Sequence, residues 1–119
     1  VEPISISVSY SSFLVSTSSL NSYPEAITAV LPCFWSYAEI AEVHKDKLSS
    51  NKNLLYKDWA KAYLTESYLR LVEKIKDLVN GAGKNFPYDK LREVFAHASR
   101  YEYLFWDAVY HRKEWLDSY

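Results

Sequence analysis

Glu102 is the residue whose position is hardest to explain by packing alone. A carboxylate on an apolar helix face costs free energy unless it is paired or protonated. A protonated carboxyl in such a place suits a general acid near neutral pH. Alternatively, Glu102 lies at the edge of the face or pairs with a basic residue of another helix. The apolar residues that share its predicted helix face are Leu91, Phe95, Ala98, Phe105 and Val109.

Cys33, the single cysteine of the chain, is the second candidate. It directly follows Pro32 and precedes Tyr37 by one helical turn. If a new helix starts at Pro32, the thiol lies in its first turn, where free N–H groups stabilise a thiolate. If the helix merely bends there, the freed group is a carbonyl and this stabilisation is absent. Because a lone cysteine in an apolar helix is also a common packing residue, a nucleophile and an inert side chain are both open.

Tyrosine is unusually frequent, with eleven in the chain. In a small helical core, tyrosine usually packs its ring and leaves the hydroxyl at the edge. A cluster of tyrosines around a cavity would instead suit a flat aromatic ligand, and both interpretations remain open. The tyrosines closest to the other candidates in the sequence pattern are Tyr10, Tyr37, Tyr63, Tyr101 and Tyr103.

Other chemistries lack support in the sequence. His44, His97 and His111 are not spaced one helical turn from each other. The Glu-x-x-His pattern of di-iron bundles is absent, so neither a metal nor a cofactor is expected. A Gly-rich phosphate loop and a Gly-x-Ser-x-Gly turn are also missing, which argues against nucleotide binding and serine hydrolysis.

The composition argues against several classes of protein. The chain has 119 residues and a net charge of -1, which fits one domain over residues 1–119 and lacks the basic surface of a nucleic-acid-binding protein. The longest uncharged apolar run, residues 29–35, is far below the ~20 residues of a membrane-spanning helix. Without a signal peptide, we expect a cytoplasmic protein without membrane contact. The absence of methionine and the start at Val1 predict a processed chain or a piece of a longer one.

The elements that must position these residues are predicted to be helices, about five in number. Only two glycines occur, both within residues 80–83, whereas an all-β fold needs many tight turns. Residues 4–10 alternate apolar residues with serine, as strands do. Because no other segment offers a strand partner, we predict a helix from about Ile6 to Leu20.

Local signals set the other predicted boundaries. Ser22 and Glu25 form a capping box at the start of the helix that contains Pro32. A short helix over residues 54–63 is followed by Thr65, which caps the next helix. Gly81 is expected in the left-handed position just past the end of that helix, and Pro87 opens the last and longest helix.

Four segments in order resemble the TenA family, the thiaminase II or aminopyrimidine aminohydrolase enzymes. Two of them resemble the paired signatures of that family: Leu-Pro-Cys-Phe-Trp-Ser-Tyr-Ala-Glu-Ile at residues 31–40 and Tyr-Glu-Tyr-Leu-Phe-Trp-Asp at residues 101–107. Tyr-Ser-Ser-Phe-Leu at residues 10–14 is similar to the aromatic segment that precedes the cysteine helix. Trp-Ala-Lys-Ala-Tyr at residues 59–63 is similar to the Trp-x-x-x-Tyr element.

The resemblance implies an all-helical bundle like that of haem oxygenase, without haem. It implies hydrolysis of an aminomethyl- or thiazolium-substituted pyrimidine, which releases hydroxymethylpyrimidine for thiamine salvage. Cys33 would attack the ring, and Glu102 would donate a proton to the ring nitrogen and the leaving group. The resemblance also implies a homo-oligomer, typically a tetramer. The residues that would bind the substrate are Tyr37, Tyr10, Tyr63 and Phe105.

The resemblance covers only the C-terminal part of the family's fold, roughly half. The missing first helices carry an aspartate that holds the aminopyrimidine edge and a further tyrosine, and neither has a counterpart here. We therefore expect an apolar face on the Glu102 helix without a partner and a pocket open on one side. The alternative to an enzyme is a catalytically inactive helical binding or interaction module.

Overall fold

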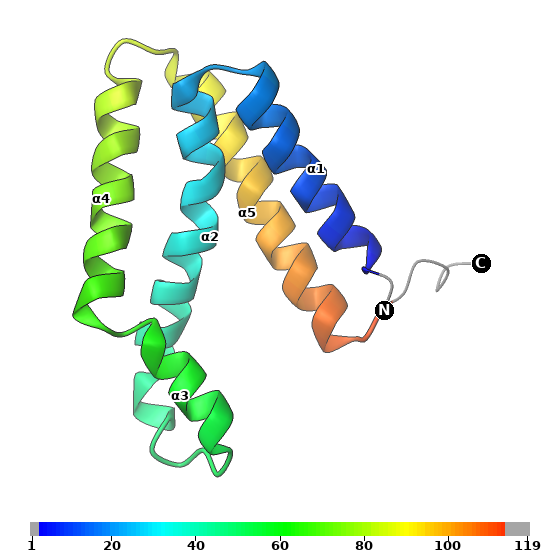
Figure 1. Ribbon diagram of the computed structural model, residues 1–119, viewed down its shortest axis with the longest axis vertical. Helices are drawn as coiled ribbons and strands as arrows, with labels where there is room; N and C mark the ends of the chain where they lie inside the picture. The colour runs from blue at the N-terminus through cyan, green and yellow to red at the C-terminus, as the bar shows by residue number, and fades with distance from the viewer. Residues whose placement is uncertain (1–2, 114–119) are drawn as a thin grey trace.

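The computed structural model describes residues 3–113, which form five α-helices and one short 3-10 helix and contain no strand (Figure 1). This confirms the predicted all-α fold of about five helices. In chain order the elements are α1 (Ser5–Leu20), α2 (Tyr23–His44), η1 (Lys45–Lys47), α3 (Leu54–Ala62), α4 (Glu66–Gly83) and α5 (Tyr88–Tyr110).

Helix α1 confirms the choice of helix over strand for the serine-rich start. No side chain caps the N-terminus of this helix at Ile4, so packing against other helices must stabilise it. The ring of Tyr10 stacks on Tyr101 of α5 with centroids 5.3 Å apart, and Phe13 packs against the same ring at 5.3 Å. Thr17 is the buried residue of the helix. Contact with α5 therefore overrides the strand-like alternation of the local sequence.

Helix α2 runs without interruption through Pro32, so the alternative in which a new helix starts there is wrong. Proline lacks the N–H that would bond the Thr28 carbonyl, which normally costs a helix about 3 kcal/mol. Pro32 and its neighbour Leu31 are both buried, and burial of apolar surface is favourable. At the N-terminus, Ser22 is the capping residue as predicted. Its hydroxyl, however, donates to the Glu25 carboxylate at 3.0 Å and caps no backbone N–H.

Helices α3 and α4 begin at side-chain caps. Asn53 accepts hydrogen bonds from two backbone N–H groups of α3, and Thr65 accepts one from Tyr68 N in α4, as predicted for Thr65. The prediction for Gly81 is wrong, because α4 continues to Gly83 and neither glycine has a positive φ. A Cβ at Gly83 would lie 3.0 Å from a Leu91 methyl group. Glycine at position 83 therefore leaves room for the Leu91 side chain at the start of α5.

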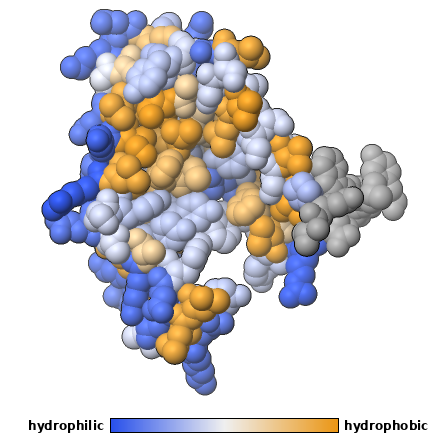
Figure 2. Space-filling view, in the orientation of Figure 1, coloured by the Kyte–Doolittle hydropathy of each residue, from blue (hydrophilic) through white to orange (hydrophobic). Residues whose placement is uncertain are grey.

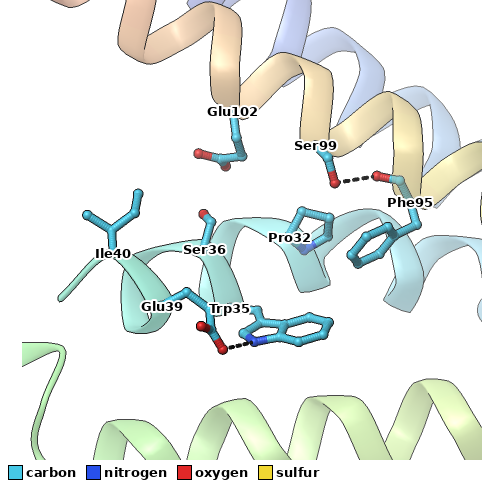
Figure 3. A pocket seen from close by; sticks show the side chains of 8 residues that line it. All are labelled: Pro32, Trp35, Ser36, Glu39, Ile40, Phe95, Ser99 and Glu102. Atoms are coloured by element: carbon cyan, nitrogen blue, oxygen red, sulfur yellow. Dashed lines mark hydrogen bonds between the residues drawn. The ribbon is translucent and has the colours of Figure 1, made fainter. Parts of the chain in front are cut away.

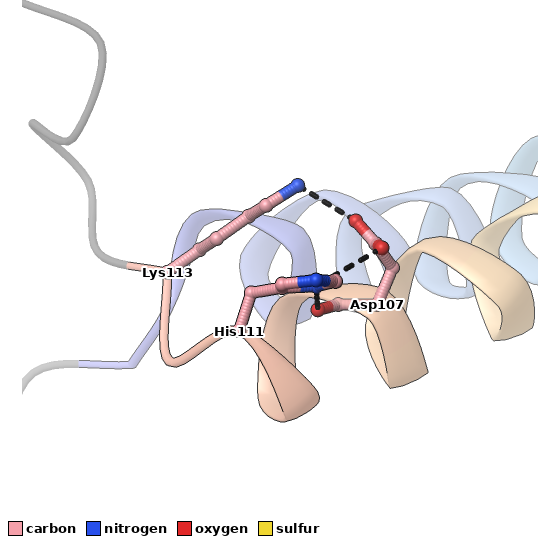
Figure 4. Close-up of polar contacts among 3 residues, drawn as sticks. All are labelled: Asp107, His111 and Lys113. Atoms are coloured by element: carbon pink, nitrogen blue, oxygen red, sulfur yellow. Dashed lines mark hydrogen bonds and ion pairs between the residues drawn. The ribbon is translucent and has the colours of Figure 1, made fainter.

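Helix α5 begins after Pro87, as predicted, and ends in a Schellman motif. Lys113 N donates to Ala108 O at 2.9 Å, and Arg112 N donates to Val109 O at 3.3 Å. Arg112 occupies the left-handed position with φ 53°. Around this end, the Asp107 carboxylate pairs with Lys113 at 2.6 Å and with His111 at 3.2 Å (Figure 4).

The core that joins the helices consists mostly of small residues. Helix α2 is central, with its most extensive contact to α5, then to α4 and to α1. Alanines let the backbones of α2 and α5 approach closely, and only a few larger aliphatic side chains are buried. The buried apolar residues are Ala29, Leu31, Ala38, Ala41, Val72, Ile75, Ala98 and Ala108.

The helices form a flat layer with extents of 48 × 44 × 21 Å. The radius of gyration is 16.3 Å, larger than the about 13–14 Å of a compact domain of this length. Figure 2 shows apolar side chains gathered on the upper part of one face, over and between α4, α2 and α5. Val109, predicted on the buried face of α5, is 46% exposed. The expectation of an apolar face without a partner within residues 3–113 thus agrees with the structure.

Candidate active site

Glu102 lies in the middle of α5 and is only 6% exposed. Its Oε1 accepts a hydrogen bond from the Tyr10 hydroxyl at 2.7 Å. Among residues 3–113 it forms no ion pair with a lysine, arginine or histidine. Both alternatives to a buried acid, a position at the edge of the stripe and pairing with a basic residue, are therefore wrong. The carboxyl group is buried among neutral hydrogen-bond donors.

Cys33 projects from α2 and is half-buried. The Glu102 carboxylate lies beside the thiol, which can donate a hydrogen bond to it. Burial, and then the negative charge of Glu102 and this hydrogen bond, raise the pKa of Cys33 to about 11. The direction agrees with an uninterrupted α2, because no helix N-terminus lies at Cys33 to stabilise a thiolate. The structure thus brings together the two residues that the sequence singled out first, with the sulfur in its thiol form near neutral pH.

Two of the predicted tyrosines surround this pair. Burial, and then the hydrogen bond to Glu102, raise the pKa of Tyr10 well above its usual range. Burial and the charge of Glu102 raise the pKa of Tyr37 to about 12. Both hydroxyls therefore stay protonated and serve as hydrogen-bond donors at neutral pH.

Tyr63 is linked to Cys33 and Glu102 through the ring of Tyr37. Its ring stacks on Tyr37 with centroids 5.1 Å apart, and Trp59 meets it edge-on at 5.1 Å. Trp106 of α5 completes this aromatic cluster, 5.7 Å from Tyr37. Trp106 was not predicted as a site residue, although it lies one helical turn after Glu102 on the same face. Tyr68, whose hydroxyl donates to Phe34 O at 2.7 Å, was also missed as a neighbour of the cluster.

Two hollows adjoin the Tyr10–Glu102 pair, one lined by Glu102 and the other by Tyr10. The larger, of about 340 Å³, opens between α2 and α5 and includes Glu102 (Figure 3). The smaller, of about 190 Å³, is lined by Tyr10, Tyr37 and Phe105, with α1 side chains. Cys33 and Tyr63 are not among the residues that line either hollow. The thiol and the carboxyl lie together, but Glu102 lines one hollow whereas Tyr10, Tyr37 and Phe105 line the other.

The other predicted residues occupy different environments. Phe105 lines the smaller hollow and packs edge-on against Trp106, with centroids 6.0 Å apart. Tyr101 stacks on Tyr10, whereas Tyr103 is 72% exposed and takes no part in the cluster. Within residues 3–113, the acidic, histidine and cysteine side chains form no group of three that could hold a metal ion. No helix in this described part combines the length and apolar character needed to cross a bilayer.

A thiol that donates to a buried carboxylate is an arrangement for proton transfer. The carboxylate can accept the thiol proton and return a proton to a nearby basic atom. A thiol with a high pKa is a poor nucleophile until a base removes its proton. Glu102 is placed to act as that base for Cys33, and Tyr10 fixes the orientation of the carboxylate.

Comparison with known proteins gives consistent results. Proteins named aminopyrimidine aminohydrolase from Halalkalibacterium halodurans and Helicobacter pylori are 29% and 32% identical to the chain, over 97% and 86% of its length. The matches cover 53% and 48% of those two proteins, so the chain spans about half the length of the curated relatives it matches. A solved TenA homologue protein from P. horikoshii OT3 is 40% identical with a TM-score of 0.89, over 93% of this chain and 52% of that one.

A family profile extends over nearly all of the chain. The profile of the TENA/THI-4/PQQC family matches residues 1–112. This range includes the cysteine helix, the aromatic cluster and the glutamate helix described above. Because the sequence profile and the backbone of the solved homologue agree over the same helices, the chain belongs to the TENA/THI-4/PQQC family.

Proposed function

We propose that this chain carries the catalytic pair of an aminopyrimidine hydrolase of thiamine salvage. The observation that carries the proposal is the contact between the Cys33 thiol and the buried Glu102 carboxylate. The names of the curated relatives support the substrate class. The substrate would be an aminomethyl-pyrimidine or thiamine, and the product hydroxymethylpyrimidine.

The reaction begins with removal of the thiol proton. With a pKa of about 11, only about one Cys33 in ten thousand is a thiolate at pH 7. Glu102 takes the proton as the sulfur bonds to a ring carbon and delivers it to a ring nitrogen. This protonation makes the otherwise poorly electrophilic ring susceptible to attack, so the nucleophile and the acid are required together.

The second half of the reaction replaces the leaving group by water. The carbon–nitrogen bond to the exocyclic methylene breaks, and the departing amine or thiazole keeps the electron pair. A water molecule then supplies the hydroxyl to the methylene carbon. The ring carbon–sulfur bond breaks and the thiol is restored. The net change is exchange of the leaving group for a hydroxyl, with no oxidant or cofactor consumed.

Tyrosines position the reacting groups in this proposal. Tyr10 holds Glu102 through its 2.7 Å hydrogen bond. Tyr37, with Tyr63 stacked on it, would contact the substrate beside the thiol. Phe105 would stack on the ring from the smaller hollow.

Assembly beyond the single chain is also a proposal. Many large apolar side chains are exposed, among them Leu20, Leu55 and Tyr110. Surfaces of this kind favour association, so we expect a homo-oligomer, a tetramer by the resemblance. Light scattering of the purified chain tests this, and a monomer at all concentrations would contradict it.

The activity is tested by measuring ammonia and hydroxymethylpyrimidine release from the aminomethyl-pyrimidine. The wild-type chain is expected to release both in equal amounts, and Cys33→Ala is expected to release neither. Turnover by Cys33→Ala at the wild-type rate would refute the nucleophile. Ligand binding without turnover, together with indifference to thiol alkylation, would instead favour a non-catalytic binding module.

A further inference from the structure

Two hollows follow one another along α5 and share Phe95 as a lining residue. The first is the hollow of about 340 Å³ between α2 and α5, which includes Glu102. The second, of about 350 Å³, lies where the end of α4 meets the start of α5 and is lined by Val79 and Leu91. The Phe95 ring, 6.1 Å from the ring of Trp35, stands where the two hollows meet. We call the two hollows together the α5 groove.

The first hollow offers an incoming molecule almost no polar atom. The Ser36 hydroxyl has no hydrogen-bond partner among residues 3–113, but its oxygen is buried and cannot be reached from the groove. The Ser99 hydroxyl donates to the Phe95 carbonyl at 2.7 Å (Figure 3), and the buried Glu102 carboxylate is held by Tyr10. The surface that remains is almost entirely apolar. It therefore suits apolar side chains better than a small polar ligand.

The second hollow carries positive charge. Lys84 and Arg92 line it, and neither forms an ion pair among residues 3–113. The described residues that line this hollow include no acidic side chain. Because complementary charges select and orient a partner at an interface, this end of the groove suits an occupant with an acidic side chain beside its apolar contacts.

The groove has the length of an ordinary α-helix. Tyr88 lines its second hollow and Glu102 its first, and the two residues lie about 21 Å apart along the axis of α5. A helix of about 14 residues spans this distance. An amphipathic helix binds a groove through apolar side chains that recur every three or four residues on one face. Two hollows in succession match side chains from different turns of one such helix.

A second copy of this chain does not fill the groove in a symmetric dimer. Two-fold pairing brings the same surface of both copies together, so it would set one groove against the other and leave both empty. An unsymmetrical contact between copies would leave one groove free at the end of every open assembly. The groove therefore favours a separate helix that presents a ridge.

The relatives indicate the source of such a helix. Nearly half of the solved P. horikoshii homologue lies outside the helices that it shares with this chain. The described helices form a layer only 21 Å thick, and a helical layer is stable when its apolar face packs against another layer. The part of the family fold outside the match is thus the natural supplier of the second layer.

We infer that the α5 groove is an interface and that its occupant is an amphipathic helix from the part of the family fold outside the match. This helix places apolar side chains in both hollows and an acidic side chain beside Lys84 and Arg92. The inference goes beyond the proposed hydrolysis, because the association does not depend on whether Cys33 reacts.

The probe is the part of the H. halodurans relative that lies outside its match to this chain, expressed together with the tagged chain. Wild type is expected to purify with it as a one-to-one complex, identified by light scattering and mass spectrometry. Dilution of the complex gives its Kd.

Three variants test the position of the interface. Ile40 lines the first hollow and is 46% exposed, and Ile40→Asp should weaken the complex at least tenfold by placing a charge on an apolar contact. Arg92→Glu should weaken it roughly threefold to tenfold, with a smaller effect at high salt. Leu78→Asp is the matched control, because Leu78 is 41% exposed and lines neither hollow. Thermal unfolding of each variant alone verifies that it folds.

The outcomes decide the occupant of the groove. A one-to-one complex that Ile40→Asp and Arg92→Glu weaken, and that Leu78→Asp leaves intact, would support the inference. Absence of a complex with wild type, or equal weakening by Ile40→Asp and Leu78→Asp, would overturn it. A self-dimer that Ile40→Asp disrupts and the probe does not displace would also overturn it, since the occupant would then be a second copy. Loss of the hydrolysis alone would leave the inference standing.

Discussion

Two of the four carboxylates of helix α5, Glu102 and Asp107, lie little more than one turn apart but in opposite environments. Glu102 is buried, and its partners are the Tyr10 hydroxyl and the Cys33 thiol. Asp107 is near the helix end, where Lys113 and His111 surround it (Figure 4). The hydrogen bond from Lys113 is the largest of the effects that hold the pKa of Asp107 below its usual value.

The difference shows that two carboxylates on one helix can be suited to different roles. A cation next to a carboxylate stabilises its ionised form and fixes its orientation. A carboxylate that meets only O–H and S–H donors can exchange protons with them and with a bound ring. Glu102 is therefore suited to proton transfer, and Asp107 to holding the end of the helix together.

The largest expected effect distinguishes the two carboxylates by activity. In the proposed reaction Glu102 accepts and delivers the proton, so Glu102→Gln should lower kcat by about 10²–10⁴-fold. Asp107→Asn, the matched control on the same helix, should keep kcat close to wild type. Steady-state ammonia release checks both variants. A similar loss in the two variants would mean that their environments do not decide their roles.

The reactivity of Cys33 should reflect its carboxylate neighbour. Its pKa rises from 9.0 to about 11, so iodoacetamide should react about a hundredfold more slowly at pH 7 than with an ordinary cysteine. The rate should then rise about tenfold per pH unit until about pH 11. Glu102→Gln should speed alkylation, because it removes one of the causes of the raised pKa. Mass spectrometry of timed samples measures these rates, and fast alkylation of wild type at pH 7 would contradict the raised pKa.

Removing the hydroxyl that holds Glu102 should have a smaller effect. Tyr10→Phe keeps the ring stacked on Tyr101 but deletes the 2.7 Å hydrogen bond. Loss of a hydrogen bond to a charged group should lower the free energy of unfolding by about 1.5–3 kcal/mol. The looser carboxylate should lower kcat by roughly tenfold. Denaturant unfolding and ammonia release measure the two effects, and an unchanged kcat would exclude a positioning role for Tyr10.

At the C-terminal end of α5, replacing a residue by glycine should stabilise the protein and leave its activity unchanged. Arg112 has φ 53°, a conformation that disfavours a side chain by about 1 kcal/mol. Arg112→Gly should therefore raise the free energy of unfolding by about 0.5–1 kcal/mol. Thermal unfolding measures the shift, and ammonia release should stay at the wild-type level. A lower Tm would show that the arginine side chain contributes more than its backbone costs.

The smallest effect concerns the pH dependence of Asp107. Because its pKa is lowered in the folded state, its contribution to stability is present above its unfolded pKa and lost as the pH falls through the folded value. Asp107→Asn should be slightly less stable than wild type at neutral pH, and the two proteins should converge in acid. Thermal unfolding across the acidic range tests this. A stability difference between the two proteins that grows as the pH falls would contradict the lowered pKa of Asp107.

Helix positions were predictable where the sequence carries local signals. Thr65 caps α4 as predicted because its side chain bonds a backbone N–H within the same turn. Gly81 misled the prediction, and Pro32 left a bend and a new helix start both open, because both residues lie inside helices that continue. At Pro32 the helix is buried among its neighbours, and local residue preferences do not contain that information.

The site was predictable in its chemistry but not in its shape. Glu102 and Cys33 stood out because a carboxyl and a thiol are unusual on apolar helix faces. Their contact could not be derived from spacing, since they lie on different helices. The division of the surrounding residues between two hollows, and the unpaired hydroxyl of Ser36, depend on side-chain packing that only coordinates reveal.

The most direct test of the central claim is a double-mutant cycle on the thiol and the carboxyl. Ammonia release is measured for wild type, Cys33→Ala, Glu102→Gln and the double variant. If the two residues act as one unit, the double variant should be no slower than the slower single variant. Losses that multiply, or a single variant with wild-type turnover, would contradict a shared role of the pair.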